Sequence, residues 1–199
     1  MKLYFNENSC AKIPLLVAME LQINLELVDV DLKNNTIPDG SSFSLINEKG
    51  YVPALELEDG TLLTEVTAIC VYLASLRPAV GMMPEENEIS YMKALEWLNY
   101  LATEIHQGFY PRFASIFGVD VGQGWLDFTE QSLMRHFVII NKSLAGKSYL
   151  LGEKLTCPDI YLFVTIGWAN LFKIDLSNLI NIQNFYEKLS ERKSIKSFM

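Results

Sequence analysis

The sequence predicts a two-domain protein, in which a small α/β domain is followed by an all-helical domain. Up to residue 77, short apolar segments with a spacing of two alternate with segments of helical spacing, and beyond residue 88 only the helical spacing continues. The segment 78–88 carries proline, glycine and three glutamates, which is typical of a linker. We therefore expect domains at 1–77 and 89–199. With half of its 199 residues apolar, the chain can form a core in each.

The first half of the α/β domain begins with the apolar run 3–5, which predicts a buried strand. A helix follows from near Cys10, and Pro14 is tolerated there because the first turn of a helix needs no N–H donor. The segment 25–31 alternates between apolar and polar residues and ends in charge, as a half-exposed strand does. The polar stretch 33–44 predicts a loop with one helical turn.

The second half of this domain is expected to be a hairpin and a helix. Residues 52–57 and 62–63 flank the Asp-Gly pair at 59–60, which is a strong hairpin signal between alternating segments. Thr64 is expected to cap the helix that follows. Counting the helical turn of the preceding loop, the order is β-α-β-α-β-β-α. The first two strands are parallel and the last two antiparallel, which is the thioredoxin-like arrangement.

Four helices are predicted beyond the linker. The first covers 89–117, with Pro111 bending its end, and the others cover 125–144, 160–172 and 182–192. The third has almost no polar face and is expected to be buried. Before it, Thr156 and Asp159 have the spacing of a capping box, in which each side chain bonds the backbone of the other residue.

Composition excludes several classes of function. The net charge is −8, and no basic cluster extends beyond Arg192-Lys193, so we expect no nucleic-acid partner. The longest apolar run, 160–172, is too short to span a bilayer, and the N-terminus lacks the apolar run of a signal peptide, so we expect no membrane association and a cytoplasmic location. Three cysteines without a CxxC pair indicate neither a metal site nor a dithiol, and an odd count of thiols fits a reducing compartment.

Cys10 is the first candidate for chemistry. At the N-terminus of a helix, N–H groups and the positive end of the dipole favour a thiolate and can lower the thiol pKa. The neighbours Ser9 and Lys12 add a hydroxyl and a cation. The alternative is a small buried residue, which is the usual fate of a free cysteine.

Two further positions could hold a peptide-like ligand. A cis Val52-Pro53 bond would let the Val52 backbone pair with an extended ligand, whereas an ordinary edge-strand proline is the alternative. Glu65 could hold a ligand ammonium while the N–H groups of Val66 and Thr67 hold its carboxylate; the alternative is a solvated partner of the helix dipole.

Several of these motifs together resemble the glutathione transferases, most closely the bacterial beta class, and the resemblance covers essentially the whole chain. It rests on Cys10 before a proline-containing helix, Gly50-Tyr51-Val52-Pro53-Ala54-Leu55, Asp59-Gly60, Leu63-Thr64-Glu65, Ala68-Ile69, Glu96-Trp97-Leu98-Asn99, Ala102-Thr103-Glu104-Ile105-His106 and Thr156-Cys157-Pro158-Asp159. It implies the glutathione transferase fold, glutathione as co-substrate with no other cofactor, and a homodimer, for which Phe43, Tyr91 and Met92 are candidate apolar contacts.

The resemblance also implies a set of site residues. Cys10 and His106 would be catalytic and would face the sulfur of glutathione. Thr103 and His106 follow Asn99 by four and seven residues, which places all three on one face of an α-helix. The other histidine, His136, is assigned a structural or solvated role. The residues implied in binding are Lys33, Asn35, Tyr51, Val52, Pro53, Glu65, Val66, Thr67 and Gln107. Asn35 and Gln107 stand where the class commonly has lysine, which predicts weaker binding of the anionic tripeptide.

The sequence thus predicts an enzyme that conjugates glutathione to small hydrophobic electrophiles. Two other functions stay open. The first is thiol-disulfide exchange with glutathione through Cys10 as the protein's own nucleophile. The second is a non-enzymatic protein of the same fold that serves as a binding or stress adaptor.

Overall fold

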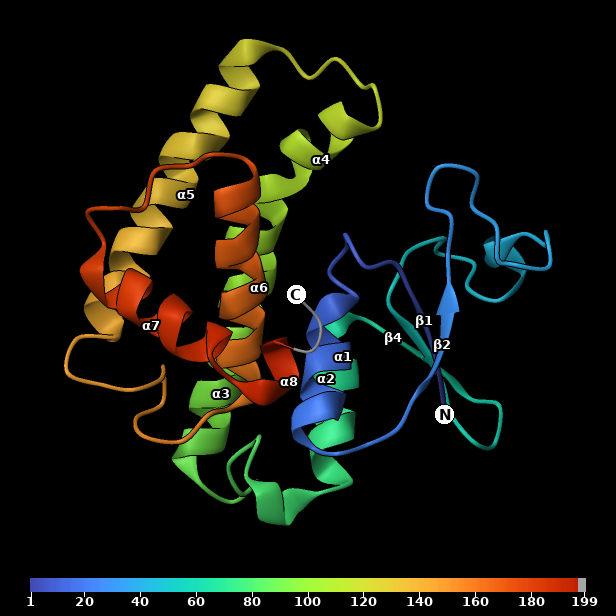
Figure 1. Ribbon diagram of the computed structural model, residues 1–199, viewed down its shortest axis with the longest axis horizontal. Helices are drawn as coiled ribbons and strands as arrows, with labels where there is room; N and C mark the ends of the chain where they lie inside the picture. Colours follow the sequence, from blue (N-terminus) through green and yellow to red (C-terminus); the bar gives the residue numbers. More distant parts are fainter. Residues whose placement is uncertain (197–199) are drawn as a thin grey trace. The chain divides into compact units, whose positions relative to one another are not determined.

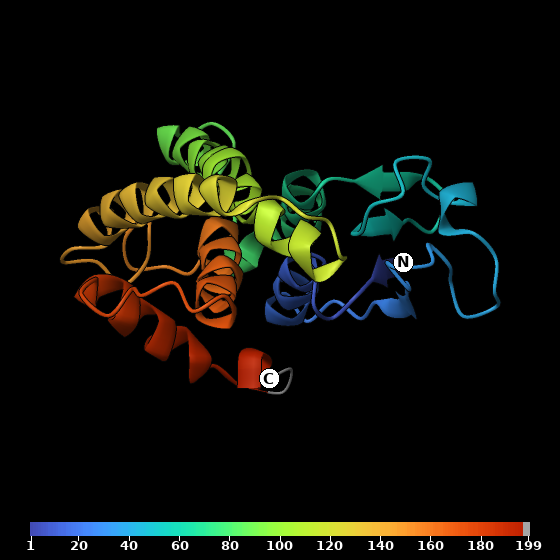
Figure 2. The same cartoon turned by 90° about the horizontal axis from the view of Figure 1, so that it is seen from above.

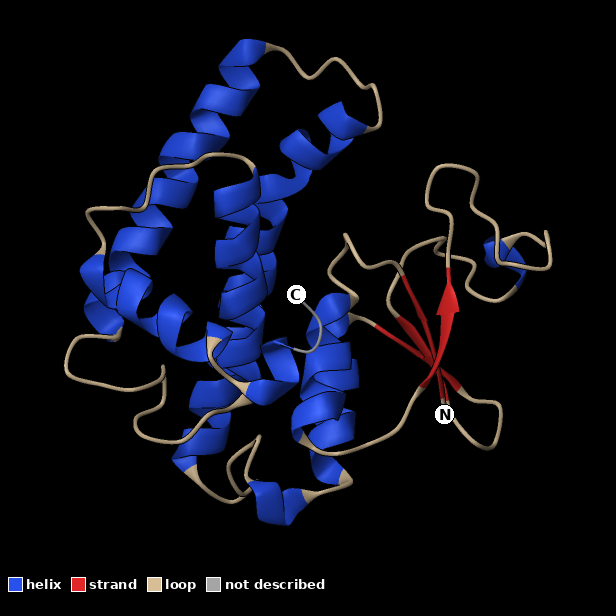
Figure 3. Cartoon of the chain, in the orientation of Figure 1, coloured by secondary structure: helices blue, strands red, loops and turns tan. Residues whose placement is uncertain are grey.

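The computed structural model describes residues 1–196 and divides into two compact units, with the boundary between Met83 and Pro84 (Figure 1). Among the described residues, all strands belong to the first unit and the second is built from helices (Figure 3). The predicted fold class, a thioredoxin-like domain followed by an all-helical domain, is confirmed.

The first unit contains a four-stranded mixed sheet in the order β2-β1-β3-β4. The central strand β1 (Lys2–Phe5) is parallel to β2 (Glu26–Asp29) and antiparallel to β3 (Ala54–Glu56), which in turn is antiparallel to β4 (Leu62–Thr64). The predicted hairpin is therefore confirmed. Its turn is closed by the Asp59 carboxylate, which accepts a hydrogen bond from the Thr61 N–H at 2.9 Å.

Both faces of this sheet are covered. Helices α1 (Lys12–Glu20) and α2 (Val66–Ser75) lie side by side on one face, and the loop that follows β2 lies on the other (Figures 1 and 2). Along β1, Leu3 and Tyr4 point to opposite faces and both are buried. On the loop side, Tyr4 packs against Phe43, with ring centroids 5.6 Å apart.

Two local expectations in this unit need comment. The helical turn predicted in the loop is the short 3-10 helix η1 (Phe43–Leu45), and a second one, η2 (Pro78–Val80), follows α2. The expected cap by Thr64 is wrong: Thr64 ends β4, and Glu65 occupies the N-cap position without a side-chain cap bond. The Thr64 hydroxyl instead accepts a hydrogen bond from Lys49 Nζ at 2.9 Å.

The second unit is a helical bundle around a buried central helix. Its helices are α3 (Ile89–Tyr100), α4 (Tyr110–Ile116), α5 (Gln123–Ser143), α6 (Cys157–Leu171), α7 (Ile180–Ser190) and α8 (Lys193–Lys196). Helix α6 is buried along most of its length, as its apolar sequence predicted, and packs against α3 and α7. Within residues 1–196, no helix combines the length and apolarity needed to cross a membrane.

The single helix expected over 89–117 is wrong. After α3, the chain forms the π-helical turn η3 (Leu101–His106) and the 3-10 turn η4 (Gln107–Phe109) before α4 begins. Pro111 does not cause the change, because it lies in the first turn of α4, where a proline is tolerated. Gly108 lets this segment approach α5: a Cβ there would come within 2.7 Å of Leu133 Cδ2.

The predicted capping box at the start of α6 is confirmed. Asp159 is fully buried, and its carboxylate accepts hydrogen bonds from the backbone N–H of Thr156 at 2.8 Å and from its hydroxyl at 2.7 Å. It also accepts one from the Leu150 N–H at 2.8 Å, a partner that the sequence did not indicate. Burial raises the pKa of Asp159 to about 6, although these hydrogen bonds oppose the shift.

Candidate functional site

In the first unit, the candidate site begins in the turn between β1 and α1. Cys10 lies two residues before the first helical residue, and the Ser9 hydroxyl accepts a hydrogen bond from the Ala11 N–H at 3.1 Å. The Cys10 side chain is half-buried, and its Sγ donates to the carbonyl oxygen of Val52 at 3.3 Å. The turn therefore holds the thiol against the backbone that precedes β3.

The expected lowering of the Cys10 pKa is wrong. Burial raises the pKa of this thiol to about 12, and the negative charge of Glu65 adds to the rise. The backbone at the start of the helix acts in the opposite direction but does not overcome the cost of removing a thiolate from water. Burial therefore favours the neutral thiol, which donates a hydrogen bond, over the nucleophilic thiolate.

Tyr51, Val52 and Pro53 form the segment leading into β3. The Val52–Pro53 bond is cis, as predicted. The Val52 side chain is buried, whereas the Tyr51 side chain is exposed. The buried Asn47 holds this segment in place, because its Nδ2 donates a hydrogen bond to the Tyr51 carbonyl at 2.7 Å.

Glu65 lies at the start of α2 with a left-handed φ of 72°, a conformation that is uncommon for a residue with a side chain. Its carboxylate is exposed and pairs with Lys49 Nζ at 2.7 Å. Val66 and Thr67 are the first residues of α2, so their N–H groups have no acceptor within the helix. This turn thus presents a carboxylate, an ammonium and backbone donors together, and the sequence reasoning missed Lys49, which stands only two residues before Tyr51.

Lys33 and Asn35, which were predicted to bind the ligand, lie in the loop after β2. Lys33 is exposed, and Asn35 is half-buried with a left-handed φ of 54°. Asn35 Nδ2 donates to the Ser44 hydroxyl, and the Asn35 carbonyl accepts from the Phe43 N–H at 2.9 Å. Asn35 therefore holds the loop in shape, which gives it a structural role beside any contact with a ligand.

The second unit carries the remaining predicted residues on α3, η3 and η4. Asn99, Thr103 and Gln107 are exposed, and the Thr103 hydroxyl donates to the Asn99 carbonyl at 3.1 Å. The expectation that His106 shares their face assumed a regular α-helix, whereas His106 ends a π-helical turn, which holds more residues than an α turn.

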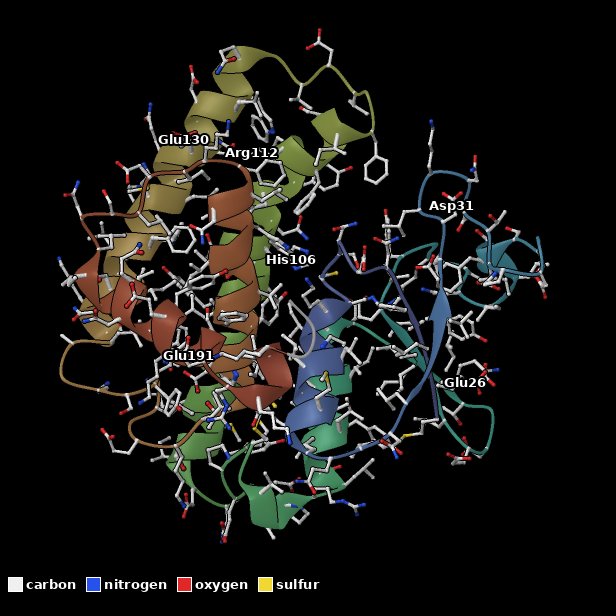
Figure 4. All side chains as sticks on the ribbon, viewed as in Figure 1. Glu26, Asp31, His106, Arg112, Glu130 and Glu191 are labelled. Carbon is white, nitrogen blue, oxygen red and sulfur yellow. The ribbon has the colours of Figure 1, made fainter. Side chains whose placement is uncertain are left out.

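His106 is half-buried between helices of its own unit (Figure 4). Its Nδ1 lies 2.7 Å from the hydroxyl of Tyr161 on α6. Its ring packs edge-on against Trp168, with centroids 4.9 Å apart. Neither partner was predicted, because both lie more than fifty residues away along the chain. His106 is therefore held by specific contacts and is not a solvated surface residue.

His136, on α5, also has specific partners. Its Nδ1 lies 2.7 Å from the hydroxyl of Tyr100, and its Nε2 lies 3.4 Å from Glu104 Oε2.

As for metals, the described part of the chain brings no three His, Cys, Asp or Glu side chains together as ligands.

Comparison with protein families gives matches in both units. Residues 9–76 match the model of the glutathione S-transferase N-terminal domain, and residues 122–199 match that of the C-terminal domain. The chain is 35% identical to glutathione S-transferase GstA of Escherichia coli O157:H7 over 196 residues, which cover 98% of this chain and 96% of that protein.

Solved structures of glutathione S-transferases are also similar to this chain. A sphingomonad glutathione S-transferase complexed with glutathione is 30% identical, with a TM-score of 0.93 over 100% of this chain and 96% of that one. A beta-class enzyme of Sphingomonas chungbukensis is 28% identical, with a TM-score of 0.92 over the same shares of both chains. The similarity therefore extends over the full length of both units.

Proposed function

Because this chain belongs to the glutathione S-transferase family, with bacterial beta-class enzymes among its structural neighbours, we propose that it conjugates glutathione to small hydrophobic electrophiles. It is a glutathione transferase, with glutathione as its co-substrate. The observation that carries the substrate assignment is the start of α2, where a carboxylate, an ammonium and backbone N–H donors come together.

The proposed binding mode assigns the γ-glutamyl end of glutathione to this turn. Glu65 would hold the α-ammonium, and the N–H groups of Val66 and Thr67 would hold the α-carboxylate. Lys49 pairs with Glu65 at 2.7 Å and can turn to the carboxylate once the ligand ammonium takes its place. Lys49, in the loop before β3, would thus supply the positive charge that the ligand carboxylate needs.

The rest of the tripeptide would follow β3. The Val52 backbone would pair with the cysteinyl residue as an added strand, with Tyr51 and Pro53 beside it. The glycine carboxylate would lie toward Lys33 and Asn35, and Gln107 is a further proposed ligand contact.

For the chemistry, we propose that the glutathione thiolate attacks the electrophile while Cys10 and His106 act on its sulfur. The thiol proton leaves to solvent, and the sulfur forms a bond to the electrophilic carbon. In a substitution, the leaving group departs with the electron pair of its broken bond. In an addition to an activated double bond, the π electron pair moves away from the attacked carbon, and the product takes up a proton from solvent. Proximity supplies much of the rate. Asn99 and Thr103 would line the electrophile side.

The raised pKa of Cys10 favours conjugation over exchange. Thiol-disulfide exchange needs a thiolate as attacking group, and burial of Cys10 favours the protonated thiol. As a donor, the Cys10 thiol can still hydrogen-bond a thiolate that the ligand brings.

We also propose that the protein is a homodimer in a reducing compartment such as the cytoplasm, which its three free cysteines support. One predicted contact is wrong: Phe43 is fully buried in its own core. Its neighbour Leu45, 83% exposed, is the better candidate in the first unit, and Met92 stays a candidate in the second.

The test is calorimetric titration with glutathione, followed by a conjugation assay with an aryl chloride. Glu65→Gln should weaken binding about tenfold or more, because a charge-assisted hydrogen bond is lost. The control Glu58→Gln removes an exposed carboxylate that pairs with the N-terminal ammonium instead, and should bind normally. Absent binding by the unmodified protein would refute the proposal and favour the non-enzymatic adaptor.

A further inference from the structure

The π-helical turn η3 is flanked by contacts with one face of α5. Before and within the turn, Tyr100 and Glu104 meet His136 of α5. After the turn, Gly108 comes so close to α5 that a Cβ there would lie 2.7 Å from Leu133 Cδ2. Leu133 and His136 are three residues apart in the helix and therefore share one face of it. This face of α5 thus contacts the chain on both sides of the turn.

A π turn depends on contacts of this kind. Its extra residue breaks the regular pattern of backbone hydrogen bonds, so such turns are rare, and they are frequent at functional sites. In η3, the Thr103 hydroxyl donates to the Asn99 carbonyl at 3.1 Å, and a bond of this type often bends a helix. His106 is the last residue of the turn, so its position depends on how the turn is held.

His136 joins the residue before the turn to a residue within it. Tyr100 ends α3, and its hydroxyl lies 2.7 Å from Nδ1, while Glu104 Oε2 lies 3.4 Å from Nε2. The two ring nitrogens are separate hydrogen-bonding groups, so one imidazole can hold both side chains at once. Solvent screens the contact with Glu104 in part, because 46% of the Glu104 side chain is exposed, against 18% for His136.

Ring packing fixes the place of the Tyr100 hydroxyl. The rings of Tyr100 and His136 cross at 70° with centroids 5.4 Å apart, and Tyr100 also packs edge-on against Trp97 at 5.7 Å. Burial raises the pKa of Tyr100, and the charge of Glu104 adds to the rise. The phenol therefore keeps its proton, and the bond to His136 joins two uncharged groups whenever the imidazole is neutral.

We propose that His136 is a positioning residue: by bonding Tyr100 and Glu104, it holds η3 in its π-helical form and so sets the place of His106 within the second unit. The action of His106 on the glutathione sulfur rests on the proposed function, whereas the positioning does not. His136 acts only through the turn and contacts no reacting atom. The sequence had assigned it a structural or solvated role.

The position of His106 is measured by NMR of its ring protons in the folded protein. Trp168 lies 4.9 Å from the His106 ring, so its ring current makes these signals sensitive to small displacements. The chain has only two histidines, and His136→Leu therefore leaves the His106 signals alone in the spectrum. We expect His136→Leu to shift them. Tyr100→Phe should shift them in the same direction, and the double variant should shift them no further than His136→Leu does, because both changes break one connection.

Two control variants separate positioning from general effects. Arg135→Ala changes the neighbouring residue of α5, which is exposed and bonds Ser132 of its own helix. Arg112→Ala removes a buried side chain that joins α4 to α5 at Thr129, so it lowers stability without touching η3. Neither should shift the His106 signals. Unshifted signals in His136→Leu, or an equal shift in Arg112→Ala, would overturn the proposal. If His136→Leu does not fold, Tyr100→Phe and Glu104→Gln, which each remove one contact, decide the question by the same criterion.

Kinetics separate this inference from the proposed function. His136→Leu should lower kcat about fivefold, a rate loss of the size of one ordinary hydrogen bond, with little change in KM for glutathione. Shifted His106 signals with an unchanged kcat would keep the positioning but refute the action of His106 on the sulfur. Unshifted signals with a lowered kcat would refute the positioning alone.

Discussion

Replacing Asp159 tests how the buried start of α6 is stabilised. Asp159→Ala removes one carboxylate that accepts three hydrogen bonds, two from Thr156 and one from Leu150. All three donors are buried and would lose their acceptor. At about 1 kcal/mol for each donor, the free energy of unfolding should fall by about 3 kcal/mol.

The same carboxylate gives the loss a characteristic pH dependence. The pKa of Asp159 is raised to about 6 in the folded protein, above its usual value, so near pH 5 the folded state holds a proton that the unfolded chain releases. Stability from this group is therefore fully present at low pH and is lost as the pH rises through about 6. Between about pH 7 and 5, the difference between wild type and Asp159→Ala should grow by about 1 kcal/mol.

Urea unfolding at both pH values measures the effect, with Asp59→Ala as the control. Asp59 closes the exposed hairpin turn, where hydrogen bonds from Thr61, chiefly from its backbone N–H, lower the pKa. Its substitution should cost less, and the cost should shrink as the pH falls. Asp159→Asn keeps one acceptor and should remove the pH term. A loss below about 0.5 kcal/mol for Asp159→Ala, or one that shrinks at low pH, would refute this account of the box.

Three further outcomes are expected. Cys10 should react with an alkylating reagent at neutral pH more slowly than a free cysteine, because its pKa is raised to about 12, and mass spectrometry that finds faster labelling would contradict this. Arg112→Ala should lower the free energy of unfolding in urea by about 2 kcal/mol, because buried Arg112 donates hydrogen bonds to Thr129 at 3.1 Å and Glu130 at 2.6 Å (Figure 4). Glu130→Gln should cost less. A larger cost for Glu130→Gln than for Arg112→Ala would be inconsistent with burial as the cause. Sedimentation should give a dimer at micromolar concentration, whereas a monomer in the unmodified protein would remove the assembly proposal.

Features that depend on residues close together in the chain were predictable from the sequence. The hairpin at Asp59-Gly60 and the box of Thr156 and Asp159 depend on residues within a few positions of one another, and both were found as expected. The residue types alone carry the required turn and cap geometry. Such local chemistry explains why the fold class could be predicted.

Features that depend on distant partners were not predictable. Lys49 meets Glu65 from another loop, and His106 meets Tyr161 from another helix. The direction of the Cys10 pKa shift was predicted wrongly for a related reason. The start of the helix can be predicted from the sequence, but the burial that outweighs its effect on the pKa depends on how the whole unit packs. Candidate residues could thus be named, while their partners and protonation could not.

The π-helical turn at 101–106 has a consequence for alignments of this chain with its relatives. A π turn is equivalent to one extra residue inserted into an α-helix, so a relative with a regular helix here would be one residue shorter between Leu98 and Phe109. A correct alignment would then need a gap inside a helix, where gaps are normally penalised. An ungapped alignment would pair His106 with the wrong position, and the histidine would seem to be lost or gained between enzymes that differ only in this turn.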